Sequence, residues 1–440
     1  MYATLSGPIT CQIELTTACV VKCLHCYNFW RSAECPTKTL KLSEIKTIIG
    51  KLSDAQVFDV VITGGEPLLA FDSLVECIRE AKKAGMSVYL NSNLVLLTKE
   101  RARVLKSLGI SYILTSIMGP NSAIHDEIAQ RAGAFEKSVA NIKLAQDEGI
   151  KIVANMVVSK INRGHVKDVG RLVHSLGVRK FTATKAGCPG NCSDFSSMEL
   201  TLGEFRQYLK DLQEIGEELG LSIDALEGYP LCGVKDLNLH HWTAGRKCLA
   251  GVTSITVASD GSVRPCSHLD VSYGNLLEED IEKIWARMDA WRTGEYLPST
   301  CTSCKLLGVC GGGCRMEAKT HSGHLNAPDP YCSPSDIEFG VRSLGEYRAR
   351  QKEQSLPKTH AEIKYFKVLF HRMRKEPFGA TVTSESRSRA FLNHDGADIL
   401  LSLETGSTYA MCDPRICWGN VDSVGFVTEL GHKKIFEVLT

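Results

Sequence analysis

Three cysteines near the start of the chain have the spacing of a metal-binding loop. Cys19, Cys23 and Cys26 form a CxxxCxxC triplet directly after an apolar, strand-like run. Three thiolates on one loop can bind three irons of a cubane iron–sulfur cluster and leave the fourth iron without a protein ligand. An open metal position is where chemistry can take place. The alternative is a zinc knuckle that includes His25, although no local fourth ligand of standard spacing follows.

A second motif follows the next strand-like run. Residues 63–68 have the sequence TGGEPL, which puts Gly64, Gly65 and Glu66 at the end of that run. Two glycines let a ligand approach the backbone closely, and the carboxylate lies where parallel strands carry their functional loops. Alone this segment is a weak indication of a ligand-binding loop. Because it follows the cysteine triplet by one strand–helix unit, it is a strong indication here.

Seven further cysteines form a second array, in which a pair separated by Gly261 precedes a dense run and a final residue: Cys248, Cys266, Cys301, Cys304, Cys310, Cys314 and Cys332. Seven thiols cannot close two cubane clusters of four ligands each, but they suffice for one closed cluster and one with three cysteines. Two structural zinc sites are the alternative. The other eight cysteines are interpreted mostly as core or surface fillers, namely Cys11, Cys35, Cys77, Cys188, Cys192, Cys232, Cys412 and Cys417.

The composition sets the compartment and excludes several classes of protein. The formal net charge of +1 over 440 residues gives no support for a nucleic-acid-binding surface. The N-terminus lacks the basic and apolar regions of a signal peptide, and no uncharged apolar run reaches the roughly 18–20 residues of a membrane span. We therefore expect a cytoplasmic protein without a membrane partner, in which clustered thiols serve metals or redox chemistry rather than disulfides.

The elements that position these motifs alternate in type between residues 9 and 225. Short β-branched runs alternate with amphipathic stretches, and Gly85, Gly109, Gly149 and Gly177 punctuate the ends of the latter. Six such units predict an α/β fold, a partial (βα)6 barrel. We predict a barrel at 1–230, a small cysteine-rich cluster domain at 231–340, a charged linking helix at 341–357 and an α+β module at 358–440.

Together these motifs resemble the radical S-adenosylmethionine (radical SAM) enzymes. The resemblance implies that Cys19, Cys23 and Cys26 hold a four-iron, four-sulfur cluster, and that Gly64, Gly65 and Glu66 bind S-adenosylmethionine. In that family the reduced cluster cleaves the cofactor to methionine and a 5′-deoxyadenosyl radical, which abstracts a substrate hydrogen. Weaker cofactor-binding assignments by resemblance are Tyr27 near the adenine, and Asn91, Asn93, Ser116 and Arg131 near the ribose and carboxylate.

One segment departs from the family pattern. Relatives often have S-x-D-G-P after the fourth strand, whereas Met118 occupies the Asp position here. The departure puts any substrate-handling role of that carboxylate in doubt. No general base and no other catalytic side chain can be assigned from the sequence.

The second array resembles the SPASM domain of radical enzymes that modify peptides and proteins. The resemblance assigns one auxiliary cluster to Cys301, Cys304, Cys310 and Cys332, and the other to Cys248, Cys266 and Cys314. This implies three four-iron, four-sulfur clusters in all. The fourth position of the cluster with three cysteines either stays open for substrate, which we favour, or is filled by Cys232.

The last ~80 residues are similar to small winged helix-turn-helix modules that hold a leader peptide along a sheet edge. The similarity lies in a strand pair before Leu392 and Asn393, which precede an Ile/Leu-rich helix predicted from Gly396 to Leu403. A structural cap on the cluster domain is the alternative for the same residues.

The leading hypothesis is a radical SAM enzyme that oxidatively modifies, and in particular crosslinks, a ribosomally made precursor peptide, with flavodoxin or ferredoxin as the electron donor. Two electron-accepting clusters suit net oxidation better than a redox-neutral epimerisation. One alternative is a sulfatase-maturing type of oxidation of Ser or Cys in a protein client. Another is a non-catalytic iron–sulfur electron carrier or zinc-stabilised adaptor.

Overall fold

The computed structural model describes residues 4–31, 36–189, 195–354, 365–384, 389–411, 413, 416–417 and 421–439. Cys35, Cys192, Cys412 and the boundary predicted after residue 357 lie outside these residues. The chain forms two compact units, Gly7–Arg348 and Ala349–Thr440, and the second unit also includes Ser6. None of the described helices is long and apolar enough to cross a bilayer.

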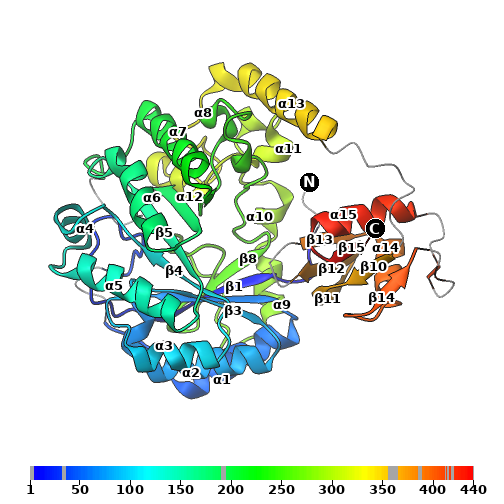
Figure 1. Cartoon of the computed structure of the whole chain (residues 1–440), viewed down its shortest axis with the longest axis horizontal. Helices are drawn as coiled ribbons and strands as arrows, with labels where there is room; N and C mark the ends of the chain where they lie inside the picture. The colour runs from blue at the N-terminus through cyan, green and yellow to red at the C-terminus, as the bar shows by residue number, and fades with distance from the viewer. Residues whose placement is uncertain are drawn as a thin grey trace. The chain divides into compact units, whose positions relative to one another are not determined.

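A nine-stranded sheet of order β7-β6-β5-β4-β3-β2-β1-β8-β9 forms the centre of the larger unit (Figure 1). Its strands are β1 (Thr10–Thr16), β2 (Asp59–Gly64), β3 (Ser87–Asn91), β4 (Tyr112–Ser116), β5 (Ile152–Val158), β6 (Lys180–Lys185), β7 (Ser222–Asp224), β8 (Ser254–Val257) and β9 (Val263–Arg264). Neighbours from β7 to β8 pair in parallel, and only β9 turns back against β8. The six predicted strands and the mixed α/β class are confirmed, and β7 and the β8–β9 hairpin extend the sheet at its two edges.

The helices that follow the strands are amphipathic, as their spacing predicts. They are α1 (Leu42–Asp54), η1 (Pro67–Ala70), α2 (Phe71–Lys83), α3 (Lys99–Ser107), α4 (Ser122–Ala129), α5 (Ala134–Asp147), η2 (Arg163–His165), α6 (Val166–Ser175) and α7 (Leu202–Leu219). In α1 the buried residues Ile45, Ile48, Ile49 and Leu52 recur at helical spacing. Thr201 and Glu204 form a capping box that begins α7, and Gly220 ends it in the left-handed conformation.

The remainder of the larger unit consists of short helices joined by turns. They are α8 (Leu231–Val234), η3 (His241–Thr243), α9 (Ile281–Arg287), α10 (Asp289–Thr293), η4 (Ser299–Cys301), α11 (Leu307–Cys310), α12 (Arg315–Ser322), η5 (Pro334–Asp336) and α13 (Ile337–Gln354). The cysteines of the second array lie on or between these helices, beside the predicted charged linking helix, which corresponds to α13. Little regular structure is longer than two turns here, apart from α12 and α13.

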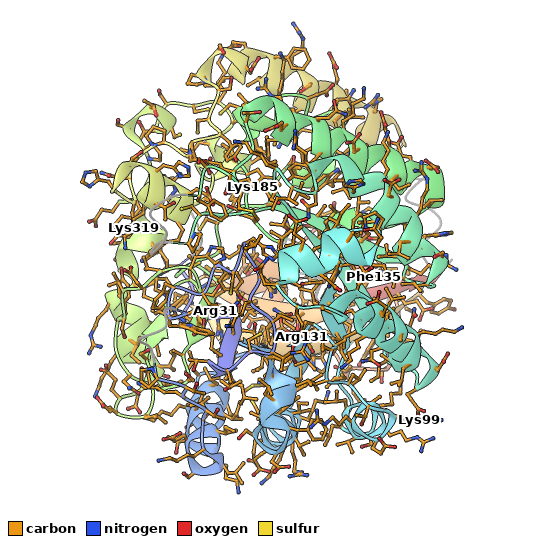
Figure 2. All side chains as sticks on the ribbon, turned by 90° about the vertical axis from the view of Figure 1, so that its left-hand side faces the viewer. Arg31, Lys99, Arg131, Phe135, Lys185 and Lys319 are labelled. Atoms are coloured by element: carbon orange, nitrogen blue, oxygen red, sulfur yellow. The ribbon has the colours of Figure 1, made fainter. Side chains whose placement is uncertain are left out.

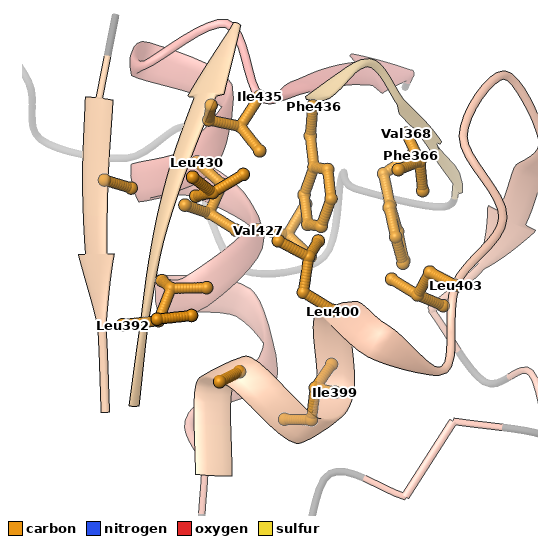
Figure 3. Packing of buried hydrophobic residues seen from close by; sticks show 14 of the residues in the cluster. Phe366, Val368, Leu392, Ile399, Leu400, Leu403, Val427, Leu430, Ile435 and Phe436 are labelled. Atoms are coloured by element: carbon orange, nitrogen blue, oxygen red, sulfur yellow. The ribbon is translucent and has the colours of Figure 1, made fainter. Parts of the chain in front are cut away.

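The smaller unit contains two three-stranded antiparallel sheets, of order β14-β10-β15 and β11-β12-β13. Its elements are β10 (Tyr365–Val368), β11 (Phe370–Glu376), β12 (Gly379–Ser384), β13 (Arg389–Leu392), α14 (His394–Leu401), β14 (Thr408–Ala410), α15 (Ser423–His432) and β15 (Phe436–Leu439). Phe366, Leu400, Val427 and Phe436 belong to its own apolar core (Figure 3). The helix predicted from Gly396 begins at His394, because the Asn393 side chain caps it by accepting a hydrogen bond from the Gly396 backbone at 2.9 Å.

Candidate active site

The cysteine triplet lies on the loop that leaves the carboxyl end of β1. Burial raises the pKa of Cys19 to about 11 and that of Cys23 to about 12, and the three thiols lie within electrostatic reach of one another. The Arg31 side chain contacts Cys26 and also approaches the other two thiols. Burial lowers the pKa of His25 to about 4, so its ring is neutral. Burial therefore keeps Cys19 and Cys23 protonated in the absence of metal, and metal binding would release their protons.

Backbone contacts fix the shape of this loop. Arg131 donates a hydrogen bond to the Val20 carbonyl at 2.6 Å, and the Lys22 and Leu24 amides donate to the end of α4 at 2.9 Å. Figure 2 labels Arg31 and Arg131, which come from segments a hundred residues apart in sequence. Arg131 is therefore placed at the loop, as a ligand-binding residue would be, while one of its nitrogens supports the loop itself.

The glycine-rich segment after β2 lies directly against the cysteine loop. The Gly65 and Glu66 amides donate to the Thr16 and Ala18 carbonyls at 2.6 and 2.7 Å. A Cβ at Gly65 would come within 2.0 Å of the Ala18 carbonyl oxygen, so no larger residue fits there. The sequence prediction attributed these glycines to a ligand, whereas the neighbour that requires Gly65 is the chain leading to Cys19.

Glu66 is buried and its carboxylate is occupied by protein donors. One oxygen accepts from the Leu68 amide at 3.0 Å and the Ser92 hydroxyl at 2.7 Å, and the other accepts from the Asn93 amide at 2.9 Å. Burial raises the pKa of Glu66, and these three hydrogen bonds oppose that rise. The Asn93 side-chain nitrogen lies 4.0 Å from the Cys19 sulfur. Glu66 thus connects the end of β2, the end of β3 and the cysteine loop.

The remaining predicted residues lie at strand ends. Asn91 and Ser116 are the last residues of β3 and β4, which are neighbours in the sheet. Tyr27 is stacked on His268, with ring centroids 4.3 Å apart. His268 follows Cys266 closely, so this stack joins the cysteine loop to the second array. His268 was not singled out from the sequence, because no spacing relates it to residue 27.

Cys248, Cys266 and Cys314, here called the first auxiliary group, lie close together at the base of the short helices. The thiols of Cys266 and Cys314 are each within electrostatic reach of Cys248, and burial raises the pKa of Cys266 to about 12. A buried ion pair of Arg264 with Glu14 connects the turn before Cys266 to β1. Arg264 also donates to the Ser267 carbonyl at 3.3 Å and the Leu269 carbonyl at 3.1 Å.

Cys301, Cys304, Cys310 and Cys332 form, with Cys232, the second auxiliary group. The Cys232 thiol contacts Cys332 and lies within electrostatic reach of Cys301 and Cys310. The contact with Cys332 lowers the pKa of Cys232 to about 7. The Leu231 amide donates to the Cys310 sulfur at 3.4 Å, and the Ser333 amide donates to the Cys232 sulfur at 3.3 Å. The sequence left Cys232 as a candidate for the first group, whereas the structure brings it to the second.

Between β6 and the first auxiliary group lies a buried charge cluster that the sequence did not reveal. The Lys185 ammonium lies 3.2 Å from both the Glu227 and the Glu317 carboxylates, and 4.8 Å from the centre of the Tyr331 ring. Lys185, which Figure 2 labels, is the last residue of β6. Burial opposes the charge on Lys185, but the carboxylates outweigh it and hold its pKa well above the usual value.

The donor chemistry of the three cysteine groups fits iron–sulfur clusters. Each group brings three or more thiols together, and thiolates are the protein ligands such clusters prefer. Within the described residues, no three His, Cys, Asp or Glu side chains are arranged to hold a single metal ion.

Comparison with known proteins agrees with these groups. Residues 13–173 match the radical SAM superfamily, and residues 248–305 match the SPASM iron–sulfur cluster-binding domain. The chain is a radical SAM enzyme with a SPASM domain. It binds S-adenosylmethionine and iron–sulfur clusters, as these domains do. The non-catalytic carrier or adaptor expected as an alternative is therefore not supported.

Curated relatives of several kinds are similar over most of this radical SAM chain. It is 27% identical to an AdoMet-dependent heme synthase of Oleidesulfovibrio alaskensis, over 74% of this chain and 88% of that protein. It is 26% identical to a PqqA peptide cyclase of Ruegeria pomeroyi, over 78% of this chain and 92% of that protein.

Solved structures show the same fold. Streptococcus suis SuiB bound to the precursor peptide SuiA is similar with a TM-score of 0.62 and 18% identity, over 75% of this chain and 77% of SuiB. The protein anSMEcpe with bound AdoMet is similar with a TM-score of 0.64 and 17% identity, over 80% of this chain and 97% of that chain. The expected partial-barrel α/β architecture is thus confirmed.

Proposed function

We propose that the protein uses radical chemistry to oxidise, and in particular to crosslink, a ribosomally made precursor peptide. The proposal of radical catalysis depends on the contact of the TGGEPL segment with the cysteine loop. In this contact the Glu66 backbone amide donates a 2.7 Å hydrogen bond to the Ala18 carbonyl. When bound, the cluster and S-adenosylmethionine would supply a 5′-deoxyadenosyl radical that abstracts a substrate hydrogen. Thiols of this kind need a reducing compartment, so we expect the protein to act in the cytoplasm.

The roles proposed for this chain's residues follow from the geometry. Cys19, Cys23 and Cys26 would hold the cluster, and Arg131 and the Glu66 carboxylate would keep their loop in place. The cofactor-binding set that the resemblance implies stays our proposal for contacts with S-adenosylmethionine, namely Tyr27, Gly64, Gly65, Glu66, Asn91, Asn93, Ser116 and Arg131. Flavodoxin or ferredoxin stays the proposed electron donor.

Two observations support a peptide as the substrate. Relatives include a PqqA peptide cyclase, and SuiB binds a precursor peptide on the same fold. In addition, the smaller unit has a groove of about 380 Å³ between α15 and β15, lined by Thr428, Gly431, His432, Phe436, Glu437 and Val438. Among the described strands, β15 pairs only with β10 and leaves its other edge available to an extended segment. We propose that a leader peptide lies along this edge.

A second candidate substrate is an iron porphyrin. The AdoMet-dependent heme synthases are 27–28% identical to this chain, compared with 24–26% for the PqqA peptide cyclases, and an Fe-coproporphyrin III synthase of Methanosarcina barkeri is 26% identical. Oxidation of Ser or Cys in a protein client stays a further alternative, because anSMEcpe is also solved with a Cys-containing peptide and AdoMet. No observation on the described residues favours the client protein over the leader-guided peptide.

The test is an anaerobic assay with reconstituted protein, S-adenosylmethionine and dithionite. We expect 5′-deoxyadenosine from the wild type and none from Cys23→Ala. Short peptides encoded beside the gene and an iron coproporphyrin are then offered as substrates. Loss of hydrogens from a peptide by mass spectrometry supports the proposal, and turnover of the porphyrin alone overturns its peptide part. If no 5′-deoxyadenosine forms, the catalytic part is wrong.

A further inference from the structure

The first auxiliary group has three thiols where a closed cubane cluster needs four ligands. The structure supplies a different donor at that position. The Glu227 side chain contacts the Cys314 thiol and lies within electrostatic reach of both Cys248 and Cys266. Glu227 interacts electrostatically with all three of these thiols.

The backbone holds Glu227 in this position. Gly228 packs so closely on the neighbouring strand of chain that a Cβ there would lie 2.9 Å from the Arg246 oxygen and 3.1 Å from the Cys248 nitrogen. The segment carrying the carboxylate therefore rests on the backbone of a cysteine ligand. Burial raises the pKa of the Cys248 thiol in this contact region.

Lys185 fixes the orientation of the carboxylate. Its ammonium lies 3.2 Å from Oε1 of Glu227 and is itself completely buried. Groups outside the ligand shell often orient a ligating side chain in this way. Glu317 lies at the same 3.2 Å distance on the other side of Lys185, so the lysine is shared between two carboxylates.

The other residue considered for this position belongs elsewhere. Cys232 lies against Cys332, and its sulfur accepts a hydrogen bond from the Ser333 amide at 3.3 Å. Its thiol is therefore part of the second auxiliary group.

We propose that Glu227 is the fourth protein ligand of the iron–sulfur cluster of Cys248, Cys266 and Cys314, and that Lys185 orients it. Carboxylate oxygen is an established ligand for protein-bound iron, and it is a harder donor than the thiolates that iron–sulfur clusters prefer. This cluster would then be closed in the resting enzyme by an oxygen ligand that a substrate donor could displace. The inference rests on the proposed cluster assignment.

The experiment removes the cluster of the cysteine loop first, so that its open iron does not interfere. In the full chain carrying Cys19→Ala, Cys23→Ala and Cys26→Ala, about eight irons per chain should remain. Adding Cys248→Ala should remove about four of them. If it does not, the cluster assignment is wrong, and this result is separate from a failure of the Glu227 proposal.

In the same background, the probe is ¹³C-labelled cyanide, followed by the hyperfine coupling of ¹³C to the reduced auxiliary cluster. We expect no coupling with Glu227 intact and a clear coupling in Glu227→Ala. Glu227→Cys should keep its iron and exclude cyanide, while changing the electron paramagnetic resonance g-values. If Glu227→Ala instead loses the cluster that Glu227→Cys keeps, the ligand role is also supported.

Glu317→Gln is the matched control, because it removes a carboxylate at the same distance from Lys185. We expect it to behave as the background protein. Equal coupling in Glu317→Gln and Glu227→Ala would mean that the lysine's charge balance, not a ligand, controls access, and the proposal would be rejected. Cyanide coupling of equal size with Glu227 intact would reject it as well.

Discussion

The two auxiliary groups differ in what surrounds their thiols. The first combines three cysteines with a carboxylate and a buried lysine, and it is anchored to β1 through the Glu14–Arg264 pair. The second gathers five thiols on short helices and turns, where Cys232 on α8 lies against Cys332. The first group therefore has no spare thiol and is joined to β1, whereas the second has a spare thiol and is joined to α7 through the Arg206–Asp336 ion pair.

The largest expected effect comes from removing one thiol from each auxiliary group, because only the second group has a spare thiol. Cys314→Ala leaves the first group with two thiols, and we expect the loss of about four irons per chain. Cys332→Ala leaves four thiols in the second group, with Cys232 in place, and should retain its cluster. Iron and acid-labile sulfide analysis measures both.

The double variant Cys232→Ala/Cys332→Ala is the control for this difference. It leaves three thiols, and we expect it to lose the cluster that Cys332→Ala keeps. If Cys332→Ala alone loses as much iron as Cys314→Ala, the spare-thiol interpretation of Cys232 fails.

The next effect tests the anchoring of the first group to the barrel. Arg264→Leu leaves the Glu14 carboxylate buried without its partner, and we expect about 3–5 kcal/mol of lost stability. Denaturant unfolding of the reconstituted protein measures this loss, and iron should be lost from the first group before the second. Arg287→Ala, which removes the solvent-exposed ion pair between Arg287 at the end of α9 and Glu279, serves as the comparison and should cost far less stability. Equal costs for the two variants would contradict the anchoring role.

A smaller effect concerns the turns around the second group. Asp336 accepts a hydrogen bond from Ser333 and forms ion pairs with Arg206 at 2.7 Å and Lys235 at 3.1 Å, and these contacts lower its pKa to about 2. Because the folded-state pKa is below the usual 3.8, the stabilisation is present above that pH and lost as the pH falls toward 2. Asp336→Asn should cost about 1 kcal/mol at neutral pH.

The measurement is urea unfolding of the wild-type and Asp336→Asn apoproteins. The difference between their unfolding free energies should shrink as the pH is lowered through the acid range. A difference that stays constant down to the lowest folded pH would show that the Asp336 charge is not responsible.

The smallest effect concerns α12, which follows Cys314. His321 is hydrogen-bonded to Glu199, and this bond raises the pKa of the imidazole although partial burial opposes it. A raised histidine pKa gives stability that is complete below the usual 6.5 and is lost as the pH rises through the folded-state value. Glu199→Gln should lower the free energy of unfolding by about 0.5 kcal/mol at mildly acidic pH, and should have no effect at alkaline pH. The melting temperature at the two pH values measures this difference. An equal decrease at both pH values would contradict this reasoning.

Sequence alone predicted the features that local pattern encodes. The β-branched run at Val60–Thr63 and the glycines after the helices fixed the strands and their order, because alternation and helix ends are local signals. The cysteine spacings revealed the three metal-binding groups for the same reason. By contrast, β8 was missed because its four residues, SITV, are too short to show a period.

What the sequence could not reveal depends on contacts between distant segments. Glu227 and Lys185 are ordinary charged residues, one after β7 and the other at the end of β6, and only the fold brings them to the thiols of the first group. The same holds for Arg264 and Glu14, 250 positions apart, and for Cys232, whose neighbour Cys332 is 100 positions away. Gly65 was singled out as a cofactor-binding residue, and the close contact that requires a glycine there is with the Ala18 carbonyl.

The stacked rings of Tyr27 and His268 also provide a path for electron transfer between the two cysteine loops. Tyr27 is bonded to Cys26, and His268 is two residues from Cys266, so one gap between rings, with centroids 4.3 Å apart, separates two otherwise covalent routes from sulfur to sulfur. A charge that crosses between the loops by this path would make a single through-space step. Any event that separates the two rings would interrupt that path.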